Sequence, residues 1–138
     1  MRKTALITGA SSGIGKEFAK QLAEQDYNLV IVARRENLLK ALARELTEVK
    51  VDIFTLDLTA DNAIDDLLKY LSEQQIQIEV LINNAGFGDY NRFDQADISK
   101  LQNMIDLNIK VLTDLTYYIG RQMLRRQSGY ILNVASTA

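Results

Sequence analysis

Short runs of apolar residues alternate with longer segments of helical periodicity along the whole chain. Five such runs predict strands, over residues 4–8, 28–33, 51–56, 79–82 and 130–135. Between these runs, apolar residues recur every three or four positions, which predicts amphipathic helices. This alternation is typical of βαβ units, so we expect one α/β domain over residues 1–138, with a doubly wound parallel sheet in the strand order 3-2-1-4-5.

The longest helical pattern runs from about residue 99 to residue 125. Ser99 and Gln102 have the spacing of a capping box at its start. Asn108 falls on the apolar stripe of this helix, so we expect a buried amide that needs a hydrogen-bond partner. Another apolar stripe begins at Ile64, and Thr59 is predicted to be the N-cap of that helix.

Polar residues and glycines gather where the predicted strands end. In chain order these features are Thr8–Gly15, Arg34 with Arg35, Asp57 with Leu58, Asn83–Gly86 and Ser136. Parallel strands of a doubly wound sheet end at one edge, and ligands bind at that edge where the strand order reverses. We therefore expect these residues to form one binding site.

The stretch Thr8–Gly15, with the sequence TGASSGIG, predicts a phosphate-binding loop between a strand and a helix. Three glycines exceed the need of an ordinary turn, because a glycine within an element costs about 1 kcal/mol relative to alanine. Gly9 would make the tight turn, Gly13 would allow close approach and Gly15 would allow close helix packing. The predicted contacts to the cofactor phosphates are Gly9, Ser11, Ser12, Gly13, Ile14 and Gly15.

Arg34 and Arg35 follow the second predicted strand, where dinucleotide folds that prefer NAD carry an acidic residue. A guanidinium at this position suits the 2′-phosphate of the cofactor NADP(H). We expect Arg34 to contribute more to that contact than Arg35. The alternative interpretation is a solvated pair of cations that caps the loop.

The composition excludes several classes of function. The chain has 138 residues, a net charge of −2, 47% hydrophobic residues and no cysteine or histidine. Disulfides, thiolate catalysis and a Ser-His-Asp triad are therefore excluded, and no metal site is predicted. No basic run suggests nucleic acid, no apolar run suggests a membrane, and no signal peptide is recognisable, so we expect a cytoplasmic protein.

Taken together, the motifs resemble those of the short-chain dehydrogenase/reductase family. Thr8–Gly15 matches the TGxxxGxG loop of that family, and Asn83–Gly86 matches its NNAG motif. Asn108 corresponds to the asparagine of the long helix, and Ser136 to the active-site serine that ends a strand. The resemblance covers residues 1–138, and the glycine spacing is that of the ordinary short type, not the extended sugar-nucleotide type.

The resemblance implies a Rossmann-type fold and an NADP-dependent oxidoreductase that transfers a hydride between the nicotinamide and a small carbonyl or alcohol substrate. Further cofactor contacts are implied for Asp57 and Leu58 at the adenine, and for Asn84, Ala85 and Gly86 near the ribose. As catalytic residues, Asn108 would hold a water of the proton relay and Ser136 would hydrogen-bond the substrate carbonyl. A homodimer or homotetramer is also implied.

The chain departs from the family pattern in one respect. The family places a Tyr-x-x-x-Lys pair about a dozen residues after the serine, and this sequence ends two residues after Ser136. Tyr117 and Arg121 have a similar spacing but precede Ser136, so they are not substitutes. We therefore expect an amino-terminal portion that binds cofactor without turning over. The alternative is a non-catalytic nucleotide-binding half-domain.

Overall fold

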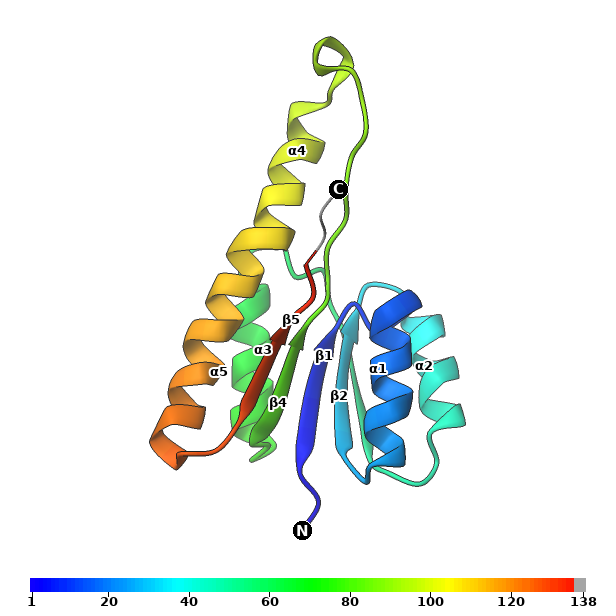
Figure 1. The fold of residues 1–138 in the computed structure, drawn as a ribbon, viewed down its shortest axis with the longest axis vertical. Helices are drawn as coiled ribbons and strands as arrows, with labels where there is room; N and C mark the ends of the chain where they lie inside the picture. The colour runs from blue at the N-terminus through cyan, green and yellow to red at the C-terminus, as the bar shows by residue number, and fades with distance from the viewer. Residues whose placement is uncertain (136–138) are drawn as a thin grey trace.

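The computed structural model describes residues 1–135 and shows one twisted sheet with helices on both faces (Figure 1). The strands are β1 (Thr4–Thr8), β2 (Asn28–Ala33), β3 (Val51–Thr55), β4 (Ile78–Asn83) and β5 (Tyr130–Asn133). All neighbouring strands are parallel, in the order β3-β2-β1-β4-β5. The predicted fold class and strand order are confirmed.

The connections between the strands are helical. They are α1 (Gly13–Glu24), α2 (Glu36–Glu45), α3 (Ala63–Glu73), the single 3-10 turn η1 (Phe93–Gln95), α4 (Ile98–Ile105), the π-helical segment η2 (Asp106–Val111) and α5 (Leu112–Arg126). Figure 1 shows α1 and α2 on one face of the sheet and α3 and α5 on the other, while α4 extends beyond the end of the sheet. The loop from β4 therefore runs beside α4 before the chain returns.

Each face of the sheet has its own apolar core. On the α1 and α2 face, Ala5, Ile7, Leu29 and Ile31 pack with side chains such as Leu39. On the α3 and α5 face, the intervening strand residues, including Leu6 and Val30, form the second cluster. Because the central strands are covered on both faces, their sequences are continuous apolar runs with no polar alternation.

The long helix differs from its prediction in three ways. Its N-cap is Asp97, whose carboxylate accepts a hydrogen bond from the Ser99 backbone N–H at 2.9 Å, so the capping box at Ser99 is wrong. It is interrupted by the π-helical segment Asp106–Val111. Asn108 lies within that segment and is exposed, so the expected burial is also wrong. A uniform α-helical repeat cannot place side chains correctly on both sides of a π turn.

Thr59 does not cap α3. The N-cap residue is Asn62, in a left-handed conformation with φ 62°, and its side chain makes no capping hydrogen bond. The hydroxyl and the backbone N–H of Thr59 instead donate to one carboxylate oxygen of Asp57, at 2.7 and 3.0 Å. An aspartate two residues upstream competes for the threonine, as short polar side chains do in turns.

β5 forms one edge of the sheet. Tyr130, Ile131 and Leu132 are 69%, 38% and 43% exposed, and within residues 1–135 only β4 pairs with this strand. Asn83 ties the strand to its neighbours, because its side-chain amide donates to Asn133 Oδ1 at 2.9 Å and to Thr116 Oγ1 at 3.1 Å. Asn83 thus orders β5 and α5 from a 4% exposed position.

Candidate functional site

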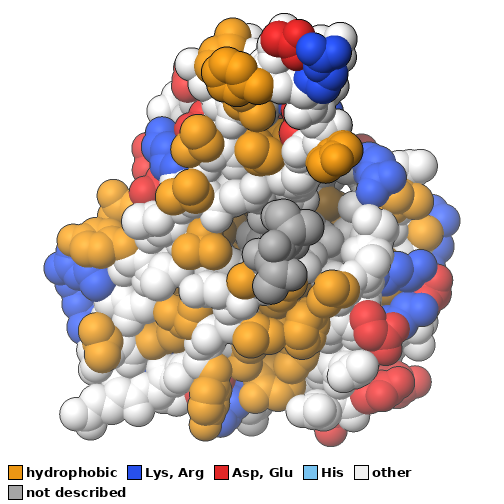
Figure 2. Space-filling model, turned by 45° about the horizontal axis from the view of Figure 1, so that its top comes forward, with side chains coloured by type: hydrophobic (Ala, Val, Ile, Leu, Met, Phe, Trp, Pro, Cys, Tyr) orange, Lys and Arg blue, Asp and Glu red, His pale blue; other side chains and the backbone are white. Residues whose placement is uncertain are grey.

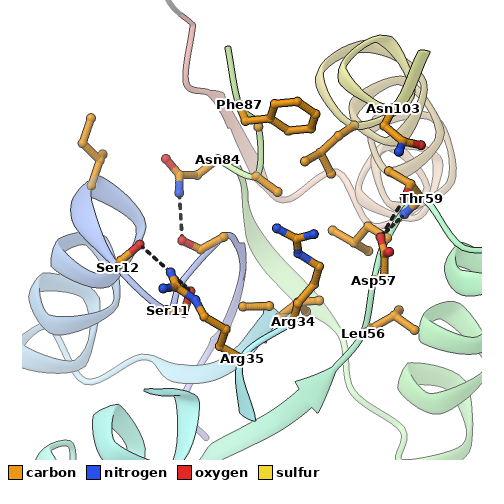
Figure 3. Close-up of a pocket in the computed structure, with 18 of the residues that line it drawn as sticks. Ser11, Ser12, Arg34, Arg35, Leu56, Asp57, Thr59, Asn84, Phe87 and Asn103 are labelled. Atoms are coloured by element: carbon orange, nitrogen blue, oxygen red, sulfur yellow. Dashed lines mark hydrogen bonds between the residues drawn. The ribbon is translucent and has the colours of Figure 1, made fainter. Parts of the chain in front are cut away.

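A cleft of about 630 Å³ lies at the carboxyl ends of β1, β2, β3 and β4. It is the switch point of this sheet, because β1 is flanked by β2 on one side and β4 on the other. Figure 3 shows side chains from all these strand ends facing the same space. The predicted site residues that line the cleft are Gly9, Ser11, Ser12, Ile14, Arg34, Arg35, Asp57, Leu58, Asn84, Ala85 and Gly86.

Four predicted site residues are not among those that line the cleft. Gly13 has nothing near its Cβ position, and Gly15 is buried behind the loop. Asn108 contacts the wall from outside, and Ser136 lies outside the described residues. The described part of the chain therefore brings together the predicted cofactor contacts other than Gly13 and Gly15, and the predicted catalytic Ser136 lies outside it.

The glycine loop is held by a junction of three residues. A Cβ at Gly15 would collide with the carbonyl oxygen of Gly9 and with the side-chain amide of Asn84. Asn84 Nδ2 also donates to the Gly9 carbonyl at 3.1 Å, and Gly9 has a φ of 67°, which favours glycine. The close approach of α1 to the loop, expected for Gly15, is therefore present.

Thr8 organises the segment after β4, and the sequence interpretation did not assign it this role. Its hydroxyl oxygen accepts from the backbone N–H groups of Asn84 and Ala85, at 3.0 and 2.9 Å, and lies 3.4 Å from the Ile82 carbonyl, to which it donates. The residue is 1% exposed. The sequence contains one sign of this role, because Thr8 is a polar residue at the end of the apolar run of β1.

The two arginines after β2 have different surroundings. Arg35 Nη2 donates to Ser11 Oγ and Ser12 Oγ, at 3.3 Å each, and so reaches the glycine loop. Arg34 points into the middle of the cleft, between the Asn84 side and the Asp57 side (Figure 3). Among residues 1–135, Arg34 makes no hydrogen bond and no ion pair, whereas the guanidinium of Arg35 binds two serine hydroxyls.

Asp57 lies on the wall of the cleft across from the glycine loop (Figure 3). The side-chain and backbone hydrogen bonds from Thr59 hold the pKa of this carboxyl below its usual value, partly offset by desolvation, with the Arg34 charge as a smaller lowering cause. A carboxylate that is already ionised and oriented offers a fixed acceptor beside the buried side chain of Leu58. The pair thus presents one polar and one apolar contact to a ligand.

Asn108 fixes the loop that borders the cleft. Its amide pairs with the backbone of Phe87 in both directions, since Oδ1 accepts from the Phe87 N–H at 3.1 Å and Nδ2 donates to the Phe87 carbonyl at 2.8 Å. A Cβ at Gly86 would meet Asn108 Oδ1. The hydrogen-bonding need expected for Asn108 is therefore met by a loop, although the side chain is exposed.

Several lining residues were missed by the sequence interpretation. They are Val32, Ala33, Leu56, Thr59, Lys100, Asn103 and Leu107. Lys100, Asn103 and Leu107 come from the long helix. The sequence prediction considered only residues at the ends of strands, so it did not place this helix beside the cleft. Lys100 also forms an ion pair of 2.8 Å with Asp89, whose side chain is only 7% exposed.

The described residues also bear on the tyrosine–arginine pair of the long helix, on metal binding and on membrane-spanning helices. Arg121 donates to the Tyr117 hydroxyl at 2.9 Å on the exposed side of α5, away from the cleft. No cluster of acidic residues within 1–135 is arranged to hold a metal ion. In the same range, none of the helices has the length and hydropathy needed to span a membrane.

The chain was compared with known proteins. A family model described as short chain dehydrogenase matches residues 3–138. A 3-oxoacyl-(acyl-carrier-protein) reductase from Staphylococcus epidermidis is 32% identical, over 99% of this chain and 57% of the relative. The chain spans less than two thirds of the length of the curated relatives it matches.

Solved structures agree with this match. A bulky-bulky ketone specific alcohol dehydrogenase from Comamonas testosteroni is 36% identical with a TM-score of 0.91, over 98% of this chain and 55% of that one. A short-chain dehydrogenase from Sphingobium yanoikuyae in complex with NADPH has the same identity and TM-score, over 98% and 54%. With a family model that covers nearly the whole sequence, and with the sheet order and loop geometry described above, the chain belongs to the short-chain dehydrogenase family.

Proposed function

We propose that the complete protein is an NADP-dependent oxidoreductase that transfers a hydride between the nicotinamide and a carbonyl or alcohol substrate. The observation that carries the proposal is the guanidinium of Arg34, which faces the cleft directly after β2, at the position where folds that prefer NAD carry an acidic residue (Figure 3). The relative in complex with NADPH supports the choice of cofactor. The relatives named for a ketone and for 3-oxoacyl groups support a carbonyl substrate.

The residues of the cleft fit such a cofactor. The junction of Gly9 and Gly15 has no room for a Cβ, so α1 packs closely against the loop. The N–H groups in the first turn of α1 have no partner within the helix and can bind phosphate oxygens, whereas the Gly9 and Ala10 N–H groups donate to the Val32 carbonyl. Leu58 and Ala85 provide an apolar surface for a ring, and Asp57 provides an acceptor beside it. Arg34 would bind the 2′-phosphate.

When bound, the nicotinamide supplies the hydride chemistry. The described residues of this chain bind and orient the cofactor: the loop holds the pyrophosphate, and the Thr8 hydroxyl fixes Asn84 and Ala85 beside it. Asn108 holds Phe87 and thereby the wall that borders the reaction centre. We further propose that the Ser136 hydroxyl donates to the substrate carbonyl oxygen, and that Asn108 also holds a water of the proton relay.

Replacing Arg34 by alanine is expected to weaken NADPH binding about tenfold to a hundredfold, because one charge-assisted hydrogen bond contributes about 1.5–3 kcal/mol. NADH has no 2′-phosphate, so its dissociation constant is expected to stay within about twofold. Titration calorimetry of the 138-residue chain with each cofactor measures both values. Arg125→Ala serves as the matched control, since Arg125 is exposed near the end of α5 and does not line the cleft. Equal losses for both cofactors would contradict the assignment of Arg34.

The 138 residues contain no Tyr-x-x-x-Lys pair. We therefore propose that this chain binds NADPH without oxidising it in the presence of a ketone or a 3-oxoacyl thioester. The absorbance of the reduced nicotinamide, followed over hours with saturating substrate, is expected to stay constant. Turnover at the rate of an ordinary reductase would show that another acid replaces the tyrosine.

The alternative function is a non-catalytic nucleotide-binding half-domain. Tight cofactor binding without turnover is common to both proposals, so the distinction is made on the natural polypeptide. Its intact mass, or the reading frame beyond Ala138, would reveal a longer chain with the tyrosine and lysine or a stop. The lengths of the curated relatives favour the longer enzyme.

We also propose that the complete protein is a homodimer or homotetramer. The long helix carries exposed apolar side chains, including Ile105, Ile109 and Leu124, which are 53%, 59% and 78% exposed. Figure 2 shows apolar side chains exposed at the surface on one side of the molecule. Surfaces of this kind are commonly covered by protein contacts.

A further inference from the structure

We infer that Arg35 is a positioning residue: by binding the hydroxyls of Ser11 and Ser12 it keeps the first turn of α1 open for the cofactor pyrophosphate. This inference rests on the proposed function and deepens it, because it assigns the two neighbouring arginines to different parts of the cofactor. Arg34 would recognise the 2′-phosphate, whereas Arg35 would act on a group that NADH and NADPH share.

The contacts of Arg35 join two loops that are distant in sequence. Its Nη2 atom lies 3.3 Å from Ser11 Oγ and 3.3 Å from Ser12 Oγ, across separations of 24 and 23 residues. Figure 3 shows the Arg35 side chain directed toward Ser11 and Ser12, whereas the neighbouring Arg34 points into the middle of the cleft. One cation therefore holds both serine hydroxyls at the same time.

Ser12 is the N-cap residue of α1, and its behaviour is unusual for that position. The N–H groups in the first turn of a helix have no partner within the helix, and a serine at the N-cap ordinarily accepts a hydrogen bond from one of them. The backbone of Ser12 is extended, with φ −160° and ψ 170°, but its side chain makes no capping hydrogen bond. The hydroxyl oxygen accepts from Arg35 instead.

α4 provides the contrast within the same chain. There the N-cap residue Asp97 closes the first turn in the ordinary way, by accepting from the Ser99 N–H at 2.9 Å. At α1 the hydroxyl that could cap in this way is instead held by Arg35. The N-cap residue of α3, Asn62, makes no capping hydrogen bond either, so the particular feature of α1 is the cation that binds the capping hydroxyl. Without Arg35, the Ser12 hydroxyl would be free to rotate onto those amides and compete with the phosphate.

The test is to replace Arg35 by alanine and measure the dissociation constants of both cofactors by calorimetry. We expect NADPH and NADH to weaken by the same factor, about fivefold to tenfold, so that their ratio stays unchanged. Arg34→Ala, measured in parallel, changes that ratio. Arg35 is exposed, so the melting temperature is expected to stay close to that of the unmodified chain.

A second substitution separates positioning from a general structural role. Ser12→Ala removes the hydroxyl that would compete for the amides, so adding it to Arg35→Ala is expected to restore most of the lost affinity. Arg35→Lys, which keeps a cationic donor, is expected to retain part of the affinity for both cofactors. It also replaces the alanine variant if that variant does not fold.

Each contrary result has a distinct meaning. A loss confined to NADPH would overturn the inference, because Arg35 would then bind the 2′-phosphate itself. An unchanged affinity for both cofactors, or a failure of Ser12→Ala to restore binding, would also overturn it. If the unmodified chain binds neither cofactor, the proposed function fails and this inference fails with it.

Discussion

Replacing Gly15 by alanine is expected to lower the free energy of unfolding by about 3 kcal/mol and to abolish most cofactor binding. Helix propensity alone predicts the opposite sign, because alanine favours a helix over glycine by about 1 kcal/mol. The collision decides the outcome, since the new Cβ would meet the Gly9 carbonyl, which is backbone and cannot rotate away. Relief requires α1 to move from the loop, and that movement displaces the phosphate-binding amides.

Thermal unfolding measures the loss of stability, and about 3 kcal/mol corresponds to a fall in melting temperature of about 10 °C for a domain of this size. Gly88→Ala is the matched control, because Gly88 is exposed, has no positive φ and has nothing near its Cβ position. Its effect is expected to stay within about 0.5 kcal/mol. A Gly15→Ala variant as stable as this control would show that the loop and α1 can separate freely.

Replacing Thr8 by valine is expected to cost about 2–4 kcal/mol, although the two side chains have nearly the same shape. The hydroxyl of the buried Thr8 accepts hydrogen bonds from two backbone N–H groups, those of Asn84 and Ala85. Both N–H groups belong to partly buried residues and would be left without a partner. A buried donor without a partner costs about 1–3 kcal/mol. Urea unfolding would measure the change, and NADPH affinity is expected to fall because Asn84 and Ala85 line the cleft.

Thr8→Ser separates the hydroxyl from the methyl group. Serine keeps both hydrogen bonds and loses one buried methyl, so a cost of only about 1 kcal/mol is expected. If the serine and valine variants lose stability equally, packing and not hydrogen bonding fixes the segment after β4. The order valine below serine below threonine in stability is the result that supports the role of the hydroxyl.

The order of the sheet could be predicted because its central strands are buried on both faces. Continuous runs such as 28–33 exclude a half-exposed antiparallel sheet, and right-handed crossovers then leave few strand orders. The cleft followed from the same reasoning: residues at the ends of parallel strands share an edge, whatever their spacing in sequence. Thus the sequence alone predicts that Gly9, Arg34, Asp57 and Asn84 lie together, as they do in the cleft.

Helix caps could not be predicted with the same success, because neighbouring polar residues compete both for the backbone N–H groups and for the side chains that could cap them. Asp57 takes Thr59 away from α3, and Asp97 caps α4 one residue before Ile98. Arg35 similarly takes the hydroxyl of Ser12. Each outcome depends on short-range geometry among several candidate acceptors, which residue type and spacing do not determine.

The residues that the long helix contributes to the cleft could not be predicted from the sequence for a different reason. Lys100 and Asn103 reach the cleft only because α4 extends past the end of the sheet (Figure 1). The length of the loop after β4 and the direction of the returning helix set that placement. Neither quantity leaves a periodic signal in the sequence.

The π-helical segment Asp106–Val111 changes the direction in which side chains point along one long helix. From its last residue onward, the buried side chains Val111, Leu115, Ile119 and Met123 recur at every fourth residue. Within the segment, Asn108 departs from that spacing and hydrogen-bonds the backbone of Phe87. The wider turn holds the extra residue without ending the helix. The side chains that serve the cleft can therefore change without shifting the register of those that hold the helix against the sheet.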